Sequence, residues 1–219
     1  MPAIGDILFL YEDRQEILWL GTAQGVFRID GADWSFYSTT NGLSRGDVRL
    51  IYQDRRGDHW FGTYGGGLNR LHKGEITSYA TDLGENNNRA WWIHEDVDGI
   101  FWVGSQDGLN RFVPPGVEDP ATIRNSNSPI QNRASAPSPA SSKIERSRFF
   151  TFTTGHGLHD VVVNNIQEDN YGNLWLSGLK GIYRVARQQL NDVAAGHREL
   201  VEALALGEAD GMLSTECNG

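Results

Sequence analysis

The sequence has few of the features that cross-link or anchor a chain. Cys217 is the only cysteine among 219 residues, so an internal disulfide is excluded. No apolar run approaches the roughly 20 residues of a membrane-spanning helix, and the first six residues lack the pattern of a secretory signal. The 28 acidic and 19 basic side chains give a net charge of -9, without the basic excess of a nucleic-acid-binding protein. We therefore expect a globular chain with no membrane span and no nucleic-acid partner.

The chain is instead rich in glycine and tryptophan, with 26 and 7 residues, and part of this content is periodic. Four segments align on a tryptophan, and in each an aspartate lies six residues earlier. A glycine lies three residues before the tryptophan in the last three copies. After the tryptophan, all four copies share a glycine that is followed three residues later by an arginine (Gly25, Gly67, Gly108 and Gly181). The aspartate–tryptophan pairs are Asp13–Trp19, Asp54–Trp60, Asp96–Trp102 and Asp169–Trp175.

The spacing of these tryptophans predicts the fold. The first two intervals are 41 and 42 residues, and each unit contains four short strand-like runs separated by glycine turns. Such a period is typical of the blades of a β-propeller, which bury their apolar faces against one another. We therefore predict an all-β chain, a β-propeller of four recognisable four-stranded blades and the start of a fifth. Within a single segment, 1–219, the blades are expected at about 3–40, 43–81, 83–153 and 158–206, and the fifth at 207–219.

Two segments depart from the repeat. The third tryptophan interval is 73 residues, and the excess falls at 113–147, which holds six of the seven prolines among many serines and alanines. This composition predicts a disordered insertion inside the third blade. Residues 186–195 contain good helix formers and no glycine or proline, so a short helix is expected there.

These motifs resemble the two-component regulator propeller repeat. The matching motifs are the Asp-x-x-Gly-x-x-Trp-x-Gly-Thr core, the Gly-Leu-Asn-Arg strand and the link Gly42-Leu-Ser44, with Gly157-Leu-His159 as a variant. The resemblance implies the sensing propeller of a larger bacterial signalling protein, periplasmic in its parent, with a histidine kinase or diguanylate cyclase as output domain. It also implies that this chain is a fragment, whose partners would be the remaining blades and that output domain.

Variation within the repeat suggests a ligand site. Five residues before the repeat aspartate stand Leu8, Arg49, Trp91 and Asn164, between columns that stay apolar. A position of the repeat that varies in this way is expected to face the central channel of the propeller. The loops next to that channel are where binding residues gather. Arginine with tryptophan suits an anionic or sugar-like ligand. The alternative is that Trp91 and Trp92 only fill core space. The predicted ligand-binding residues are Arg45, Arg49, Asn88, Arg89, Trp91, His159 and Asn164.

No catalytic or metal-binding pattern stands out, and no cofactor or catalytic residue is expected. Residues 95–99 resemble the start of a calcium loop but lack its later ligands, which favours a turn role for Asp96. His156 and His159 are close together without the further ligands that zinc requires.

Three functions remain open from the sequence. The first is a ligand-sensing module for a small molecule, such as an oligosaccharide, and the second is a protein-interaction scaffold. The third is an enzyme like the streptogramin lyases, for which His94 and Glu95 would be the best remnant of a site. We expect no enzymatic activity, and association into a homodimer is left open.

Overall fold

The computed structural model describes residues 4–79, 89–123, 144–145, 149–207 and 210–212. Its first two sheets are antiparallel blades, each formed by four strands consecutive in the chain. Blade one comprises β1 (Ile7–Glu12), β2 (Leu18–Thr22), β3 (Val26–Asp30) and β4 (Asp33–Tyr37), and blade two comprises β5 (Val48–Gln53), β6 (His59–Thr63), β7 (Gly67–His72) and β8 (Glu75–Tyr79).

The second half of the chain repeats this arrangement, with an interruption inside blade three. The short helix α2 (Arg187–Ala194) lies within the predicted range and separates the last two strands of blade four. Blade three comprises β9 (Trp92–Glu95), β10 (Phe101–Ser105), β11 (Gly108–Phe112) and β13 (Phe149–Phe152), and blade four comprises β14 (Asn165–Glu168), β15 (Asn173–Gly178), β16 (Gly181–Ala186) and β17 (Leu204–Leu206).

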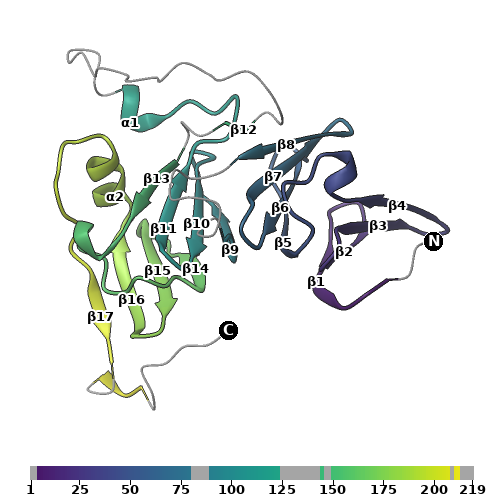
Figure 1. The fold of residues 1–219 in the computed structure, drawn as a ribbon. Coiled ribbons are helices and arrows are strands. Elements are labelled where there is room, and N and C mark those ends of the chain that lie inside the picture. Colours follow the sequence, from purple (N-terminus) through teal and green to yellow (C-terminus); the bar gives the residue numbers. More distant parts are fainter. Residues whose placement is uncertain (1–3, 80–88, 124–143, 146–148, 208–209, 213–219) are drawn as a thin grey trace.

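The blades follow one another in sequence order, with blade one at one end of the molecule and blade four at the other (Figure 1). The first strands of neighbouring blades contact each other, as β1 does β5 and β9 does β14. Short 3-10 turns, η1 (Thr39–Asn41) and η2 (Thr154–His156), lead into the links after blades one and three. This arrangement confirms the predicted all-β propeller blades. In the described part of the chain, no helix is long and apolar enough to cross a membrane.

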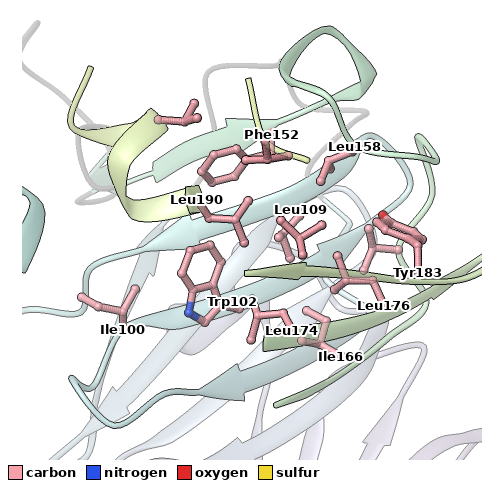
Figure 2. Packing of buried hydrophobic residues seen from close by; sticks show 14 residues of the cluster. Ile100, Trp102, Leu109, Phe152, Leu158, Ile166, Leu174, Leu176, Tyr183 and Leu190 are labelled. Atoms are coloured by element: carbon pink, nitrogen blue, oxygen red, sulfur yellow. The ribbon is translucent and has the colours of Figure 1, made fainter. Parts of the chain in front are cut away.

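The apolar core is divided into three clusters, each lying between two neighbouring blades. Trp19, Trp60 and Trp102 each occupy one cluster and are at most 2% exposed. In the largest cluster Trp102 lies among side chains of blade four and of α2, including Leu174 and Leu190 (Figure 2). Burial of this apolar surface between sheets is what holds the blades together.

The repeated aspartate organises the first hairpin of each blade. In blade two, Asp54 Oδ1 accepts the backbone N–H groups of Arg56 and Asp58 at 3.0 and 2.9 Å, and its Oδ2 accepts the indole N–H of Trp60 at 3.0 Å. The indole is bonded to the corresponding aspartate in the other three blades at 2.8 to 2.9 Å. One carboxylate thus fixes both the turn and the orientation of the buried ring.

The glycine two residues after the tryptophan, present in the first three blades, allows close approach between blades. A Cβ built on Gly21 would lie 2.6 Å from the carbonyl oxygen of Val48, and one on Gly104 would lie 2.6 Å from that of Val163. Both oxygens belong to the neighbouring blade. Any larger residue would therefore push the blades apart.

Parts of the insertion depart from the disorder predicted for 113–147. Residues 120–123 form α1 (Pro120–Ile123), and β12 (Ile144–Glu145) pairs in parallel with β8, adding a fifth strand to the outer edge of blade two. Asp119 pairs with Arg111 of blade three and accepts the N–H of Ala121 at 2.9 Å. Polar contacts to the blades therefore order segments whose composition alone indicated no structure. The predicted start of a fifth blade lies mostly outside the described residues.

Candidate functional site

We call the place where two neighbouring blades meet a step. At the step between blades two and three, two arginines predicted to bind ligand lie close together. The guanidinium carbon of Arg89 lies 3.9 Å from the centre of the Tyr64 ring, and that of Arg49 lies 5.0 Å from it. Tyr64 and Arg89 also form an isolated backbone bridge between the two blades. Tyr64 is 40% exposed, so the solvent reaches this aromatic centre and its two flanking cations. Distances of this kind are typical of cation–π contacts.

The two arginines differ in their partners. Arg49 is paired with Asp47, with Nε and NH2 donating to the two carboxylate oxygens at 2.9 and 3.2 Å. The hydrogen bond to Asp47 raises the pKa of Arg49 above its ordinary value. Arg89 donates instead to the neutral amide oxygen of Gln106, and its buried Nε has no hydrogen-bond partner among the residues that the structure describes. Arg89 is therefore the cation with unused donor capacity at this step.

Arg45 lies at the same step. A Cβ built on Gly66 would come within 2.8 Å of Cγ of Arg45, so the Arg45 side chain passes against the turn that follows Tyr64. Arg45 is exposed, so its side chain lies at the surface beside this turn. Asn88, predicted to belong to the site, lies outside the described residues.

The adjacent tryptophans Trp91 and Trp92 have different surroundings. Trp92 packs against the core between blades three and four, and its indole N–H donates to the carbonyl oxygen of Ile166 at 3.0 Å. Trp91 is half-buried, and its backbone N–H donates to the carbonyl oxygen of Gly104 at 3.0 Å. Trp92 is thus packed against a core cluster, whereas Trp91, which is equally half-buried, is part of none of the three clusters.

His159 and Asn164 belong to the next step, between blades three and four. The His159 ring lies 5.7 Å from the ring of Tyr183, and the backbone N–H of Asn164 donates to Ser177 at 2.8 Å. Tyr183 is fully buried, and its hydroxyl has no hydrogen-bond partner within the described ranges of the chain. Burial, assisted by the negative charge of Asp160, raises the pKa of Tyr183. The structure thus places the predicted residues on two successive steps of the same arc.

Sequence reasoning missed the aromatic centre of the site and the partner of Arg89. Tyr64 and Gln106 both lie in the turn between the second and third strands of a blade, whereas the prediction compared only the first strands and the links. An alignment of these turns would have shown Tyr64 and Gln106 opposite Ala23 and Leu179, in a column that varies as much as the one containing Arg49.

The acidic residues of 95–99, which resemble the start of a calcium loop, form ion pairs with an arginine in this structure. Arg187 at the start of α2 contacts Asp96 at 3.0 Å, Asp98 at 2.6 Å and Glu168 at 2.9 Å. Burial lowers the pKa of Arg187, but hydrogen bonds to Asp98 and Asp96 and the nearby negative charges outweigh it, so the pKa is raised. No group of metal-ligating side chains is found among the described residues.

The residues that resembled a lyase remnant serve the contacts between blades. His94 Nε2 lies 2.9 Å from Glu168 of blade four. Glu95 accepts the hydroxyl of Tyr52 at 2.9 Å and the backbone N–H of Arg55 at 3.0 Å, both from blade two. The two side chains therefore point to different neighbouring blades instead of converging on one substrate.

Comparison with known proteins agrees with the repeat type. Residues 42–65 match the sequence model of the family described as "Two component regulator propeller". This segment runs from the link after blade one to the turn containing Tyr64, and the match confirms the resemblance found from the motifs. No curated protein matches the chain.

Solved structures show the same fold at low sequence identity. The extracellular domain of the hybrid two-component system BT3049 of B. thetaiotaomicron has a TM-score of 0.65 and 22% identity, covering 96% of this chain and 24% of that one. The extracellular domain of BT4673 of the same organism has a TM-score of 0.62 and 21% identity, covering 91% and 25%. Virginiamycin B lyase from Staphylococcus aureus has a TM-score of 0.60 and 14% identity, covering 96% and 58%. The chain thus spans about a quarter of the two extracellular domains.

Proposed function

We propose that this chain is part of a ligand-sensing propeller that binds a small molecule at the step between blades two and three. Arg45, Arg49, Tyr64 and Arg89 would form the site, with Trp91 at its border. The repeat type supports a sensing role, since residues 42–65 match the two-component regulator propeller. His159 and Asn164 would contribute only to a ligand large enough to reach the next step.

The observation that carries the proposal is the pairing of an exposed aromatic ring with an arginine that contacts no carboxylate among the residues that the structure describes. The Tyr64 ring is 40% exposed beside two guanidinium groups, and the Arg89 side chain is hydrogen-bonded, among the described residues, only to the neutral amide of Gln106. An acidic sugar meets both requirements, because its ring packs on aromatic surfaces and its carboxylate accepts hydrogen bonds from a guanidinium. The proposed ligand class is therefore a glycan fragment that carries a negative charge.

Isothermal titration with glucuronate and galacturonate oligosaccharides tests this assignment, with neutral glucose and galactose oligosaccharides as the comparison. We expect heat of binding for at least one acidic series and a loss of roughly tenfold or more in affinity for Arg89→Ala. Arg198→Ala is the matched control, because Arg198 is a surface arginine paired with Glu202 within one segment. Equal binding by Arg89→Ala and the unchanged chain would remove the site from the proposal.

The wider role follows from the same resemblance. We propose that the parent protein carries this propeller outside the cytoplasmic membrane and passes the signal to an output domain. Two extracellular domains of two-component systems share the fold, which supports that location. We propose that the chain itself catalyses no reaction, because His94 and Glu95 are occupied by contacts between blades. Magnesium-dependent lyase activity that disappears in His94→Ala would contradict this part.

A further inference from the structure

Tyr64 is joined through its backbone to two residues of opposite charge. Its N–H donates to the carbonyl oxygen of Asp47 at 2.8 Å, and it forms the backbone bridge with Arg89. Asp47 and Arg89 hold the same position of the repeat, seven residues before the repeat aspartate of blades two and three. One position of the repeat therefore brings a carboxylate to the proposed site from one blade and a guanidinium from the next.

The carboxylate of Asp47 occupies one of the two arginines beside the ring. Its two oxygens accept hydrogen bonds from Nε and NH2 of Arg49 at 2.9 and 3.2 Å. This is the bidentate arrangement in which a guanidinium holds a carboxylate, so a ligand carboxylate can take it only by displacing Asp47. The side chains of Asp47 and Arg49 are 31% and 45% exposed, so a ligand at the ring meets both charges.

Arg89 offers a different environment on the same ring. Among the residues that the structure describes, it contacts no carboxylate and donates to the neutral amide of Gln106. Both guanidinium carbons lie within 5.0 Å of the centre of the Tyr64 ring, so one sugar ring packed on Tyr64 lies near both arginines. The site thus combines a cation without a bound carboxylate with an ion pair whose carboxylate faces the same ligand.

We propose that Asp47 is a specificity-determining residue that restricts the site to glycan fragments with an isolated carboxylate. The inference rests on the proposed function and defines its ligand more narrowly. The carboxylate of the sugar ring on Tyr64 binds Arg89, whereas a carboxylate on the adjacent sugar ring meets the negative charge of Asp47. Like charges this close repel each other, whereas the hydroxyl groups of an uncharged ring donate hydrogen bonds to Asp47.

Isothermal titration with a galacturonate trimer in two forms tests this assignment. One form keeps every carboxylate, and the other has all but one converted to methyl esters, so the two share their sugars and linkages. We expect the unchanged chain to bind the singly charged form roughly fivefold more tightly. Asp47→Asn should remove this preference by releasing Arg49 to a second carboxylate. Arg49→Ala should increase it, because the charge of Asp47 is then unpaired.

Asp30→Asn is the matched control. Asp30 also pairs with an arginine two residues away in the chain, Arg28, at 2.8 Å, but this pair lies on β3 of blade one. The control should keep the preference of the unchanged chain. A general weakening of the fold would reduce the binding of both trimers alike, so opposite shifts in Asp47→Asn and Arg49→Ala identify a direct effect of the Asp47 charge.

Equal or tighter binding of the fully charged trimer by the unchanged chain would overturn the inference, and so would shifts in the same direction in the two variants. If Asp47→Asn fails to fold, Arg49→Ala decides by itself, and an unchanged preference in that variant overturns the inference. Binding that is lost in Arg89→Ala but does not respond to Asp47→Asn overturns this inference alone. The absence of binding by either trimer removes the proposed function as well.

Discussion

Blades two and four contain the same aspartate–tryptophan unit in different surroundings. The indole–carboxylate distance is 3.0 Å in blade two and 2.9 Å in blade four. Trp60 is fully buried by blade three, whereas Trp175 is only half-buried because no described segment covers its face as a further blade would. The comparison shows that the unit itself fixes the local hairpin, whereas the neighbouring blade supplies most of the burial.

The largest expected effect is at the buried tryptophan. Trp60→Ala should lower the free energy of unfolding by about 3–5 kcal/mol, because it empties the core between blades two and three. Trp175→Ala should cost about 1–2 kcal/mol, because part of that ring is already in water. Urea unfolding followed by circular dichroism measures both. Equal losses would mean that packing between blades does not set the stability.

The next effect concerns the carboxylate under the buried ring. Asp54→Ala should cost about 2–3 kcal/mol, since it removes the acceptor for three N–H groups. Asp54→Asn should recover part of the loss, because one amide oxygen remains as an acceptor. The same denaturation series measures both variants, and a smaller loss for Asp54→Ala than for Asp54→Asn would contradict this role.

A smaller effect is expected from pH at the contact between blades one and two. His59 packs on Trp19, with ring centres 4.2 Å apart, and its Nε2 lies 3.0 Å from Asp13. Burial lowers the pKa of His59, although the contact with Asp13 opposes this. The unfolded chain therefore binds the proton first as pH falls, and stability present above about pH 6.5 is lost below it.

The urea midpoint should accordingly decrease between pH 7 and pH 5, and His59→Gln should reduce that decrease. His197→Gln is the control, because His197 is exposed on the turn after α2. Asp13 responds in a lower range. Burial raises its pKa, but hydrogen bonds from Trp19, Ile17 and Gln15 outweigh this and lower it, so its contribution is lost only below about pH 4. An unchanged slope in His59→Gln would exclude His59 as the cause.

The smallest expected effect is at the exposed arginine of the proposed site. Arg49→Ala should change the free energy of unfolding by less than about 0.5 kcal/mol, because exposed ion pairs such as Arg49–Asp47 contribute little. Thermal unfolding measures this change. A large drop would show that Arg49 stabilises the fold.

The fold followed from the sequence because its determinants are local and repeated. Each aspartate acts within six residues of its tryptophan, so the pattern is visible without tertiary information. The same alignment explains its one exception, since Glu16 adopts φ 61° at the turn position where Gly57 has φ 93°. A non-glycine residue there costs strain but does not abolish the turn.

The site was only partly predictable because it is formed between blades. Arg49 was found from a variable column, whereas Tyr64 lies in a turn that the sequence marked only by its glycines. The contact of Tyr64 with Arg89 joins residues of two blades, so it cannot be predicted from the repeat pattern within one blade. The structure of the insertion was missed for a similar reason, because Asp119 is held by Arg111 across a loop.

Hydrogen–deuterium exchange with and without a bound acidic oligosaccharide tests the central claim most directly. We expect slower exchange in peptides that contain Arg49, Tyr64 and Arg89, and little change in the peptide around Tyr171 at the blade-four hairpin. Protection spread evenly over all four blades, or confined to blade four, would contradict a sensing site at the step between blades two and three.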